Sequence, residues 1–522
     1  MSPARRASAV FLCAFAYLAW LAASRYVFFM NDEGIYLDGA LRVLHGQMPY
    51  RDFFAISGPG TFALLAASFR VFGTTLMAAR IPVLWDIAII TACLFWLVCK
   101  LGDSKLSNST AAALTAFVYL PFATLAETAV VANHRWDSSA WAILGGTLLL
   151  AAVENRAEQN PGTRPFVLSF AAGTAAGLAA WFTPPVALAA VALGACLILY
   201  RTTRRLFPAY ASGVAVMFSA GAFWIVSTGT LPAMLNSFRW TAANYSSANR
   251  TGYAAVPGGY ANLLHSSSLS QAAATILVVA FFILPAALPF FSAVWLWKRP
   301  SVSVVILLTL GVALVFSAYP RWDVNHLTWV SAPFYALTAV WIAGWSSRKL
   351  VRFRKAVALI ALLAGSSCFA VTIHSRLGET TRVTNLGTIH GRPSDLDLLE
   401  TIQARVTPSD TLFVFPYRPL LYFVTGAHNP TQYSFLQPGM FPDQDEAQAL
   451  RQLNAHPPRW VLYAHVSTET YLLLWPNSDP RRLRMPRIET FLGENYRGRE
   501  QWEDLQLLEL RDGGSVARAD AH

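Results

Sequence analysis

Residues 7–29 read ASAVFLCAFAYLAWLAASRYVFF, and the four residues that follow, 30–33, read MNDE. A helix needs about 20 mostly apolar residues to cross a bilayer, so this run is long enough to span one. Arg5 and Arg6 precede it as in a signal peptide, but the run is longer than a typical h-region and no small-residue cleavage site follows. We therefore expect a first transmembrane helix with two adjacent carboxylates at its far end.

Further apolar runs continue this pattern over most of the chain. Only 13% of the 522 residues are charged, against about 25% in soluble domains. Charge is scarce up to position 374 and returns afterwards, which divides the chain into a membrane body, residues 1–375, and a C-terminal domain, residues 376–522. Together with the first run, the apolar segments predict about eleven transmembrane helices. The other segments are approximately 78–99, 109–126, 138–153, 166–182, 184–200, 207–227, 271–297, 301–318, 327–345 and 356–374.

The C-terminal domain has the pattern of a small soluble α/β fold. Residues 410–416, DTLFVFP, read as a buried strand, and residues 459–464, RWVLYA, read as another. Residues 443–454 between them read as a short helix. At about 150 residues this domain is long enough to bury its own core. The expected fold class is an α-helical polytopic membrane protein with a C-terminal α/β soluble domain.

The basic residues indicate how the helices are oriented. If residues 59–77 lie along the membrane surface, every strong Lys/Arg cluster falls on one side, which the positive-inside rule assigns to the cytoplasm. We therefore expect a multi-pass protein of the bacterial inner membrane with a cytoplasmic N-terminus and a periplasmic C-terminal domain. The same distribution explains the net charge of +11 without nucleic-acid binding. The clusters contain Arg5, Arg6, Lys100, Lys105, Arg156, Arg164, Arg201, Arg204, Arg205, Lys298, Arg299, Arg348, Lys349, Arg352, Arg354 and Lys355.

The polar residues that could carry chemistry gather in the loops on the other side. Asp32 and Glu33 are costly to hold beside a membrane unless they are used or paired, which makes them candidate catalytic residues. Asp52 follows in the same loop and is a candidate substrate-binding residue. The alternative interpretation is a solvated loop whose acids cap helices.

The later outer loops add cations that are suited to a phosphate. The fourth loop holds Arg321, Asp323 and His326, and a guanidinium can bind a phosphate through two parallel hydrogen bonds. A structural Arg321–Asp323 pair is the alternative. The remaining candidate substrate-binding residues are His134, Arg135 and Asp137 in the second loop and Arg239 in the third. Asp137 is also placed to cap the helix that follows it.

Other kinds of site lack their sequence signatures. Nothing resembles a P-loop, a dinucleotide-binding fingerprint, a set of zinc ligands or a nucleophile elbow. Asp86 is the one acidic residue in the middle of a predicted span, whereas a proton or ion path usually needs several. A transporter or flippase for lipid-linked sugars is therefore less favoured. A non-catalytic envelope assembly protein, which would tolerate loss of Asp32, stays open as a third interpretation.

Several short motifs resemble the GT-C membrane glycosyltransferases, in particular the protein O-mannosyltransferases and the lipid A aminoarabinose transferases. Asp32-Glu33 after the first span resembles the acidic first-loop motif of that family. The sequence Tyr319-Pro320-Arg321 with Asp323 and His326 resembles a late outer-loop motif. The stretches 40–59, 72–80, 176–185 and 415–431 are also similar to bacterial members, so the resemblance extends over most of the chain.

The resemblance implies a membrane glycosyltransferase, hexosyl or pentosyl, with a polyprenyl-phosphate-sugar donor. It also implies an acceptor hydroxyl on a glycan, lipid or protein at the outer face, inversion at the sugar carbon, and Asp32 as the general base. Ser57 and Gly58 replace an acidic residue and a Lys of some relatives, and Thr183 replaces another Lys. No cofactor is assigned from these residues, and the question of a divalent metal stays open.

The chemistry of the residues agrees with this implication. A lipid phosphate is already a good leaving group, so an enzyme must chiefly hold the phosphate, remove a proton from the acceptor and align the two. We expect Arg321, His326 and Arg135 to hold the phosphate while Asp32 accepts the proton. Glu33 or Asp52 would assist by positioning.

Overall fold

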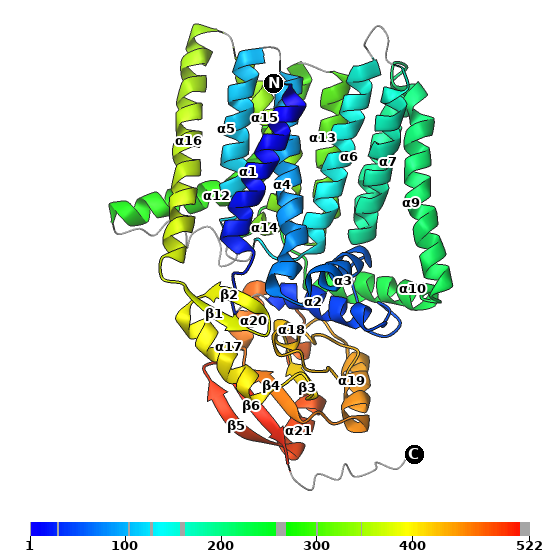
Figure 1. Cartoon of the computed structure of the whole chain (residues 1–522), viewed down its shortest axis with the longest axis vertical. Helices are drawn as coiled ribbons and strands as arrows, with labels where there is room; N and C mark the ends of the chain where they lie inside the picture. Colours follow the sequence, from blue (N-terminus) through cyan, green and yellow to red (C-terminus); the bar gives the residue numbers. More distant parts are fainter. Residues whose placement is uncertain are drawn as a thin grey trace.

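The computed structural model describes residues 2–28, 31–102, 105–125, 129–156, 162–256, 268–298, 301–345 and 347–511. Parts of the predicted loops 127–137 and 228–270, together with Arg299 of the basic clusters and the end of the tail, lie outside the described residues. A bundle of long helices forms one end of the molecule, and the C-terminal α/β region forms the other (Figure 1).

Long apolar helices make up the bundle. Six described helices have the length and composition to cross a membrane, namely α1 (Pro3–Ala22), α4 (Leu76–Leu101), α6 (His134–Arg156), α7 (Arg164–Phe182), α9 (Phe207–Ser227) and α16 (Arg348–Arg376). The others in the bundle are α5 (Lys105–Ala123), α8 (Ala187–Leu199), α12 (Leu269–Lys298), α13 (Val302–Ser317) and α15 (Ala332–Ala343). These helices identify a multi-pass membrane protein, and the count of eleven spans remains a prediction.

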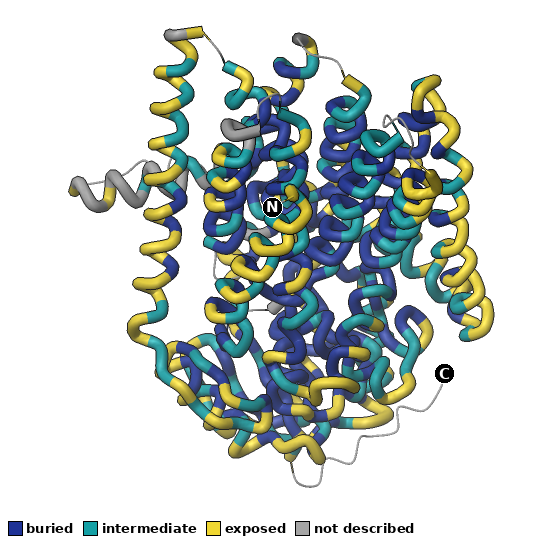
Figure 2. The backbone as a smooth tube through the Cα atoms, turned by 45° about the horizontal axis from the view of Figure 1, so that its top comes forward, coloured by how far each residue is buried: buried dark blue, intermediate teal, exposed yellow. Residues whose placement is uncertain are grey.

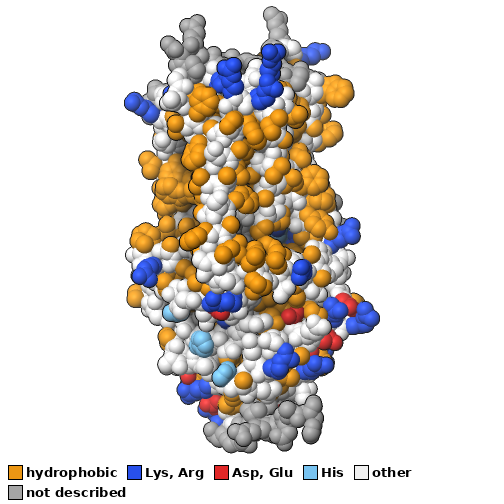
Figure 3. Space-filling model, turned by 90° about the vertical axis from the view of Figure 1, so that its right-hand side faces the viewer, with side chains coloured by type: hydrophobic (Ala, Val, Ile, Leu, Met, Phe, Trp, Pro, Cys, Tyr) orange, Lys and Arg blue, Asp and Glu red, His pale blue; other side chains and the backbone are white. Residues whose placement is uncertain are grey.

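The surface of the bundle suits a bilayer. Buried residues fill its interior, and its outer helices carry exposed residues (Figure 2). Many of those exposed residues are large and apolar, among them Leu199, Phe223 and Ile360. These residues form a broad hydrophobic band on the face shown in Figure 3, with Lys and Arg at its upper edge and charges of both signs below it. Inside, small residues let the helices approach closely: a Cβ added to Gly173 would lie 2.0 Å from the carbonyl oxygen of Tyr210.

A layer of shorter helices separates the bundle from the C-terminal region. It contains α2 (Asn31–Leu44), α3 (Gly60–Phe72) and α10 (Leu231–Trp240) (Figure 1). At 1.5 Å per residue α3 is about 20 Å long, which is shorter than the hydrocarbon core. Both ends of this segment lie at the same end of the bundle, because Gly58 donates to the carbonyl oxygen of Phe182 and Leu76 to that of Leu386. Residues 59–77 thus have the arrangement expected of a surface segment.

The C-terminal region is a mixed α/β structure. A hairpin of β1 (Thr380–Thr384) and β2 (Gly387–Gly391) leads into a four-stranded sheet of order β3-β4-β6-β5, in which only β3 and β4 are parallel. Its strands are β3 (Leu412–Phe415), β4 (Trp460–Ala464), β5 (Tyr496–Trp502) and β6 (Leu505–Leu510). Its helices are α17 (Pro393–Arg405), α18 (Leu420–Thr425), α19 (Asp443–Ala455), α20 (Thr468–Leu474) and α21 (Pro486–Asn495). Strands β3 and β4 and helix α19 fall in the segments predicted as two strands and a helix.

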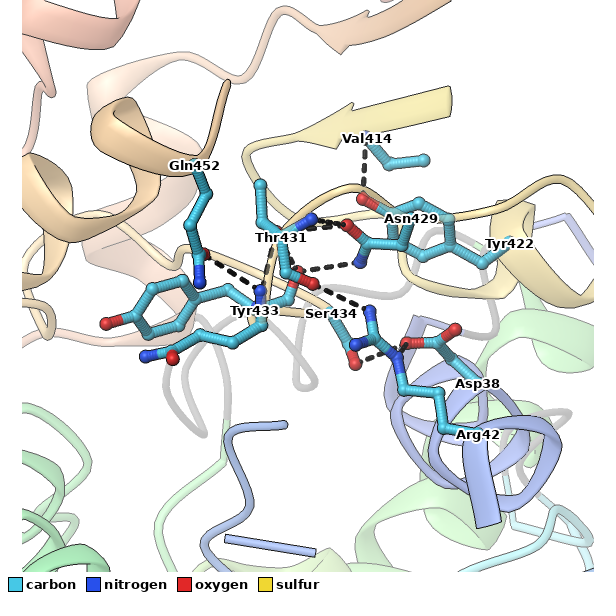
Figure 4. A network of polar contacts seen from close by, with 10 residues as sticks. Asp38, Arg42, Val414, Tyr422, Asn429, Thr431, Tyr433, Ser434 and Gln452 are labelled. Carbon is cyan, nitrogen blue, oxygen red and sulfur yellow. Dashed lines mark hydrogen bonds and ion pairs between the residues drawn. The ribbon is translucent and has the colours of Figure 1, made fainter. Parts of the chain in front are cut away.

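Helix α2 is fixed to the C-terminal region by buried contacts. Gly34 makes the closest approach, since a Cβ there would lie 1.9 Å from the backbone nitrogen of Leu420 at the start of α18. Further along α2, the buried carboxylate of Asp38 accepts hydrogen bonds from Arg42 at 3.0 Å and from Ser434 at 2.6 Å. Arg42 also donates to the carbonyl oxygen of Thr431 at 3.0 Å (Figure 4). The position of α2 therefore depends on both parts of the molecule.

Candidate active site

Asp32 lies in the first turn of α2, where the bundle meets the C-terminal region. Its side chain is exposed, and its Oδ1 accepts a hydrogen bond from the hydroxyl of Tyr417. Tyr417 comes from the turn between β3 and α18, and its buried ring packs edge-on against Phe435 and Trp475, with centroids 5.4 and 5.6 Å away. An accessible carboxylate is thus held by a side chain from the other end of the chain.

Three tyrosines and an arginine lie within electrostatic reach of this carboxylate. The charge of Asp32 acts on Tyr36, Tyr245, Tyr417 and Arg321, so these groups share one electrostatic environment. Burial raises the pKa of all three tyrosines above the ordinary value, and the negative charge of Asp32 raises it further. These hydroxyls therefore stay protonated at neutral pH and can donate hydrogen bonds.

The fourth outer loop contributes an ordered group of three charged or polar side chains. Asp323 caps α14 (Val324–Val330) and accepts from the backbone and Nδ1 of His326, the latter at 2.8 Å, and from Nε of Arg321 at 3.0 Å. Burial would raise the pKa of Asp323, but His326 and Arg321 outweigh that effect and lower it below its usual range. The ionised Asp323 therefore orients both neighbours, and the structural pair considered in the sequence is present.

His326 is held as a neutral imidazole. Its pKa is lowered by burial and by the charges of Arg321 and Arg135, although Asp323 acts in the opposite direction. With Nδ1–H donated to Asp323, the neutral ring has an unprotonated Nε2, which accepts hydrogen bonds and cannot donate one. The ring is thus better suited to orienting Asp323 and Arg321 than to donating to a phosphate.

Arg135 adds a second guanidinium to the cluster. It lies in the first turn of α6, is buried, and donates from Nη1 to the carbonyl oxygen of Ser317 at 2.6 Å. Both Arg135 and Arg321 act electrostatically on Tyr245, so the two cations lie on the same polar cluster. Because Asp32 also acts on Tyr245, the two arginines and this carboxylate belong to one cluster, which can receive an anionic group.

The third outer loop closes the cluster through backbone pairing. Thr251 donates to the carbonyl oxygen of Pro320 at 3.1 Å, and Ala254 donates to that of Trp322 at 2.7 Å. The side chain of Asn249 accepts from Nη1 of Arg321 at 3.5 Å. The loop that carries Tyr245 is therefore fixed to the loop that carries Arg321.

Glu33 is adjacent to Asp32 in sequence but lies in a different environment. It is fully buried, and both of its oxygens accept from Arg80 of α4, at 2.5 and 2.7 Å. The backbone N–H of Ala132 donates to the same carboxylate at 3.1 Å, and Arg80 also donates to the carbonyl oxygen of Ala22. These contacts join α2 to the bundle, so the geometry gives Glu33 a structural partner.

His134 and Asp137 border the cluster from α6. The ring of His134 lies 5.6 Å from that of Tyr36, and its Nδ1 is 2.7 Å from the hydroxyl of Thr183. Asp137 is buried and accepts from the hydroxyl of Thr61, which connects it to α3. His134 is thus next to the site, whereas Asp137 faces the packed interior.

Asp52 and Arg239 are not brought to the cluster. Asp52 accepts from Arg51 at 2.8 Å and from the backbone of Met48 at 2.7 Å, which stabilises a turn. The hydrogen bond from Arg51 also lowers the pKa of Asp52. Arg239 is exposed and contacts Asn236 of its own helix at 3.5 Å. Over the described part of the chain, no three His, Cys, Asp or Glu side chains are grouped as a metal site requires.

The main residues that the sequence did not single out are Tyr36, Tyr417 and Asn249. Tyr36 carries a usable signal, because it lies four residues after Asp32 and therefore on the same face of a helix. Tyr417 and Asn249 reach the site only through tertiary contacts with distant segments. No local pattern in the sequence could have connected them to Asp32 or Arg321.

Neither the models of known protein families nor the curated proteins gave a match to this chain. Solved structures did match. ArnT from Cupriavidus metallidurans bound to undecaprenyl phosphate has 14% identity and a TM-score of 0.57, over 98% of this chain and 98% of that one. The oligosaccharyltransferase AglB from Archaeoglobus fulgidus, in complex with an inhibitory peptide and a dolichol-phosphate, has 12% identity and a TM-score of 0.53, over 94% and 72%. This likeness confirms the predicted fold class.

Proposed function

We propose, on the premise that this chain has the GT-C fold, that it transfers a sugar from a polyprenyl-phosphate donor to an acceptor hydroxyl. The observation that carries the proposal is the shared environment of the exposed Asp32 carboxylate and the Arg321 guanidinium, with Arg135 in the same cluster. A base beside two cations is what displacement of a lipid phosphate requires. The structures of ArnT with undecaprenyl phosphate and of AglB with a dolichol-phosphate support the choice of donor class.

In the proposed reaction, the acceptor oxygen attacks the sugar carbon on the face opposite the phosphate. The bond between that carbon and the phosphate oxygen breaks, its electron pair stays with the phosphate, and the sugar carbon is inverted. Asp32 takes the proton of the acceptor hydroxyl, a contribution of roughly 10²–10⁴-fold. Arg321 and Arg135 balance the charge on the departing phosphate. Neutral His326 keeps Asp323 and Arg321 in place.

The proposed orientation follows from the distribution of charge. Lys and Arg occur at the edge of the hydrophobic band away from the C-terminal region, and charges of both signs occur near that region (Figure 3). The positive-inside rule then gives a cytoplasmic N-terminus and a periplasmic C-terminal domain, residues 376–522. The site would open to the periplasmic face of the inner membrane, where its acceptor is a glycan, lipid or protein.

Release of polyprenyl phosphate tests the function whatever the sugar is. The full-length protein would be reconstituted with polyprenyl-phosphate sugars extracted from bacterial membranes and with an envelope acceptor fraction, and free polyprenyl phosphate would be measured by mass spectrometry. We expect release by the wild-type protein and at least a hundredfold slower release by Asp32→Asn. Equal release by both proteins would overturn the proposal. Movement of the donor across the bilayer without release would instead identify a flippase.

A further inference from the structure

We propose that the C-terminal region completes the site with a positioning residue, Tyr417, whose hydroxyl holds the Asp32 carboxylate in the orientation that a base requires. The inference rests on the proposed function, because it assigns a task to a group that acts through Asp32. It gives the C-terminal region a direct part in the chemistry instead of a role as an appended domain.

Packing of its ring fixes the position of Tyr417 at the site. Its ring is packed edge-on between Phe435 and Trp475, so the hydroxyl has a fixed position. The strand before it is anchored by Tyr422, whose hydroxyl accepts from the backbone of Val414 at 2.8 Å. A buried aromatic ring with a hydrogen-bonded tip keeps few alternative rotamers.

Asp32 and Tyr417 belong to segments of the chain that are in close contact. Gly34, two residues after Asp32, lies against the backbone of Leu420, three residues after Tyr417. The network of Asp38, Arg42 and Ser434 then fixes the rotation of α2 about its axis (Figure 4). Helix α2 can therefore neither turn nor slide without breaking buried contacts, and the hydroxyl and the carboxylate are held in register.

The two oxygens of the Asp32 carboxylate have different surroundings. Tyr417 engages Oδ1, and among the described residues no hydrogen bond is donated to Oδ2. One oxygen is thus used for orientation while the other can take the proton of the acceptor. The groups within electrostatic reach of this carboxylate are Tyr36 of the same helix, Tyr245 of the third loop, Arg321 of the fourth and Tyr417 itself.

The test compares Tyr417→Phe with Tyr471→Phe in the full-length protein, using the release of polyprenyl phosphate. Tyr471 is a matched control because its ring packs on the same Trp475 and its buried hydroxyl has no hydrogen-bond partner among the described residues. We expect Tyr417→Phe to lower kcat about tenfold or more, with little change in KM for the donor. Tyr471→Phe should change neither quantity.

The outcomes separate this inference from the proposed function. If Asp32→Asn is inactive while Tyr417→Phe keeps the wild-type kcat, the function stands and the positioning role is overturned. If Asp32→Asn is fully active, the function itself fails. Should Tyr417→Phe fold poorly, 3-fluorotyrosine at position 417 keeps the ring and makes the hydroxyl a stronger donor. The value of kcat should then differ from that of the wild-type protein while KM for the donor does not, and an unchanged kcat would overturn the proposal.

Discussion

The first turn of α2 carries two adjacent carboxylates whose environments differ sharply. On one side Asp32 is exposed, accepts from a tyrosine and lies in the field of Arg321. On the other side Glu33 is fully buried and bound by both ends of the Arg80 guanidinium. Adjacent residues of a helix point about 100° apart, so only one of the two acids can face the site. The comparison indicates that a pair of acids here combines one accessible group with one anchor.

Asp32→Asn tests the reactive side and should have the largest effect. The amide keeps the size of the side chain but cannot accept a proton, so transfer should fall roughly 10²–10⁴-fold at unchanged thermal stability. Asp52→Asn is the matched control from the same loop, where the carboxylate only stabilises a turn. The measurement is release of polyprenyl phosphate at matched protein levels. Comparable losses in both variants would show that Asp32 and Asp52 do not differ in role.

Arg80→Met tests the anchoring side. It leaves Glu33 as a buried carboxylate without its cation, which should destabilise the fold by roughly 3–5 kcal/mol. Glu33→Gln, which removes the charge, should be milder. We expect a lower folded yield and a lower unfolding temperature in detergent, with a nearly normal rate for each folded molecule. A stable Glu33→Gln protein that has lost transfer would show that Glu33 takes part in the chemistry.

Arg321→Ala tests whether the Arg321 guanidinium binds the phosphate of the donor. Removing a charge-assisted contact should weaken binding of undecaprenyl phosphate about ten- to a hundredfold, and Arg321→Lys should recover only part of it because the fork is lost. The probe is undecaprenyl phosphate added to the protein in nanodiscs. Arg239→Ala is the control, since Arg239 is exposed and contacts only its own helix among the described residues. Equal affinity in both variants would place the phosphate elsewhere.

His326→Asn should have the smallest effect, about tenfold or less on transfer, because the amide can still donate to Asp323. The pH dependence of stability is the sharper measurement. Since the pKa of His326 is lowered in the folded protein, its contribution is present above about pH 6.5 and is lost as the pH falls below that value. The unfolding temperature of His326→Asn should therefore depend less on pH between about 5 and 7. An identical slope in both proteins would contradict the buried neutral imidazole.

The sequence predicted the features that depend on local pattern. Long apolar runs indicated the helices, and the short apolar runs in residues 410–416 and 459–464 indicated the buried strands β3 and β4. The predicted placement of Asp32 and Arg321 in loops on one side of the membrane made a shared site geometrically possible, and the two residues lie within electrostatic reach of one another. These inferences needed only composition and chain direction.

What the sequence could not predict depends on pairing across long distances. Glu33 looked like a second reactive acid because its partner Arg80 lies 47 residues away on another helix. Tyr417 reaches Asp32 across 385 residues, and only the packing of α18 on α2 brings them together. Asp52 and Asp137 look similar in sequence, yet one stabilises a turn and the other is bonded inside the bundle to Thr61.

The contact between Asp32 and Tyr417 also has a consequence for biosynthesis. A ribosome makes the carboxylate first and the hydroxyl 385 residues later. The partly synthesised chain can insert its helices long before the partner of Asp32 exists. The contact can therefore form only after residue 417 has been made and brought to the same side of the membrane, so a truncated product would occupy the bilayer with the candidate site incomplete.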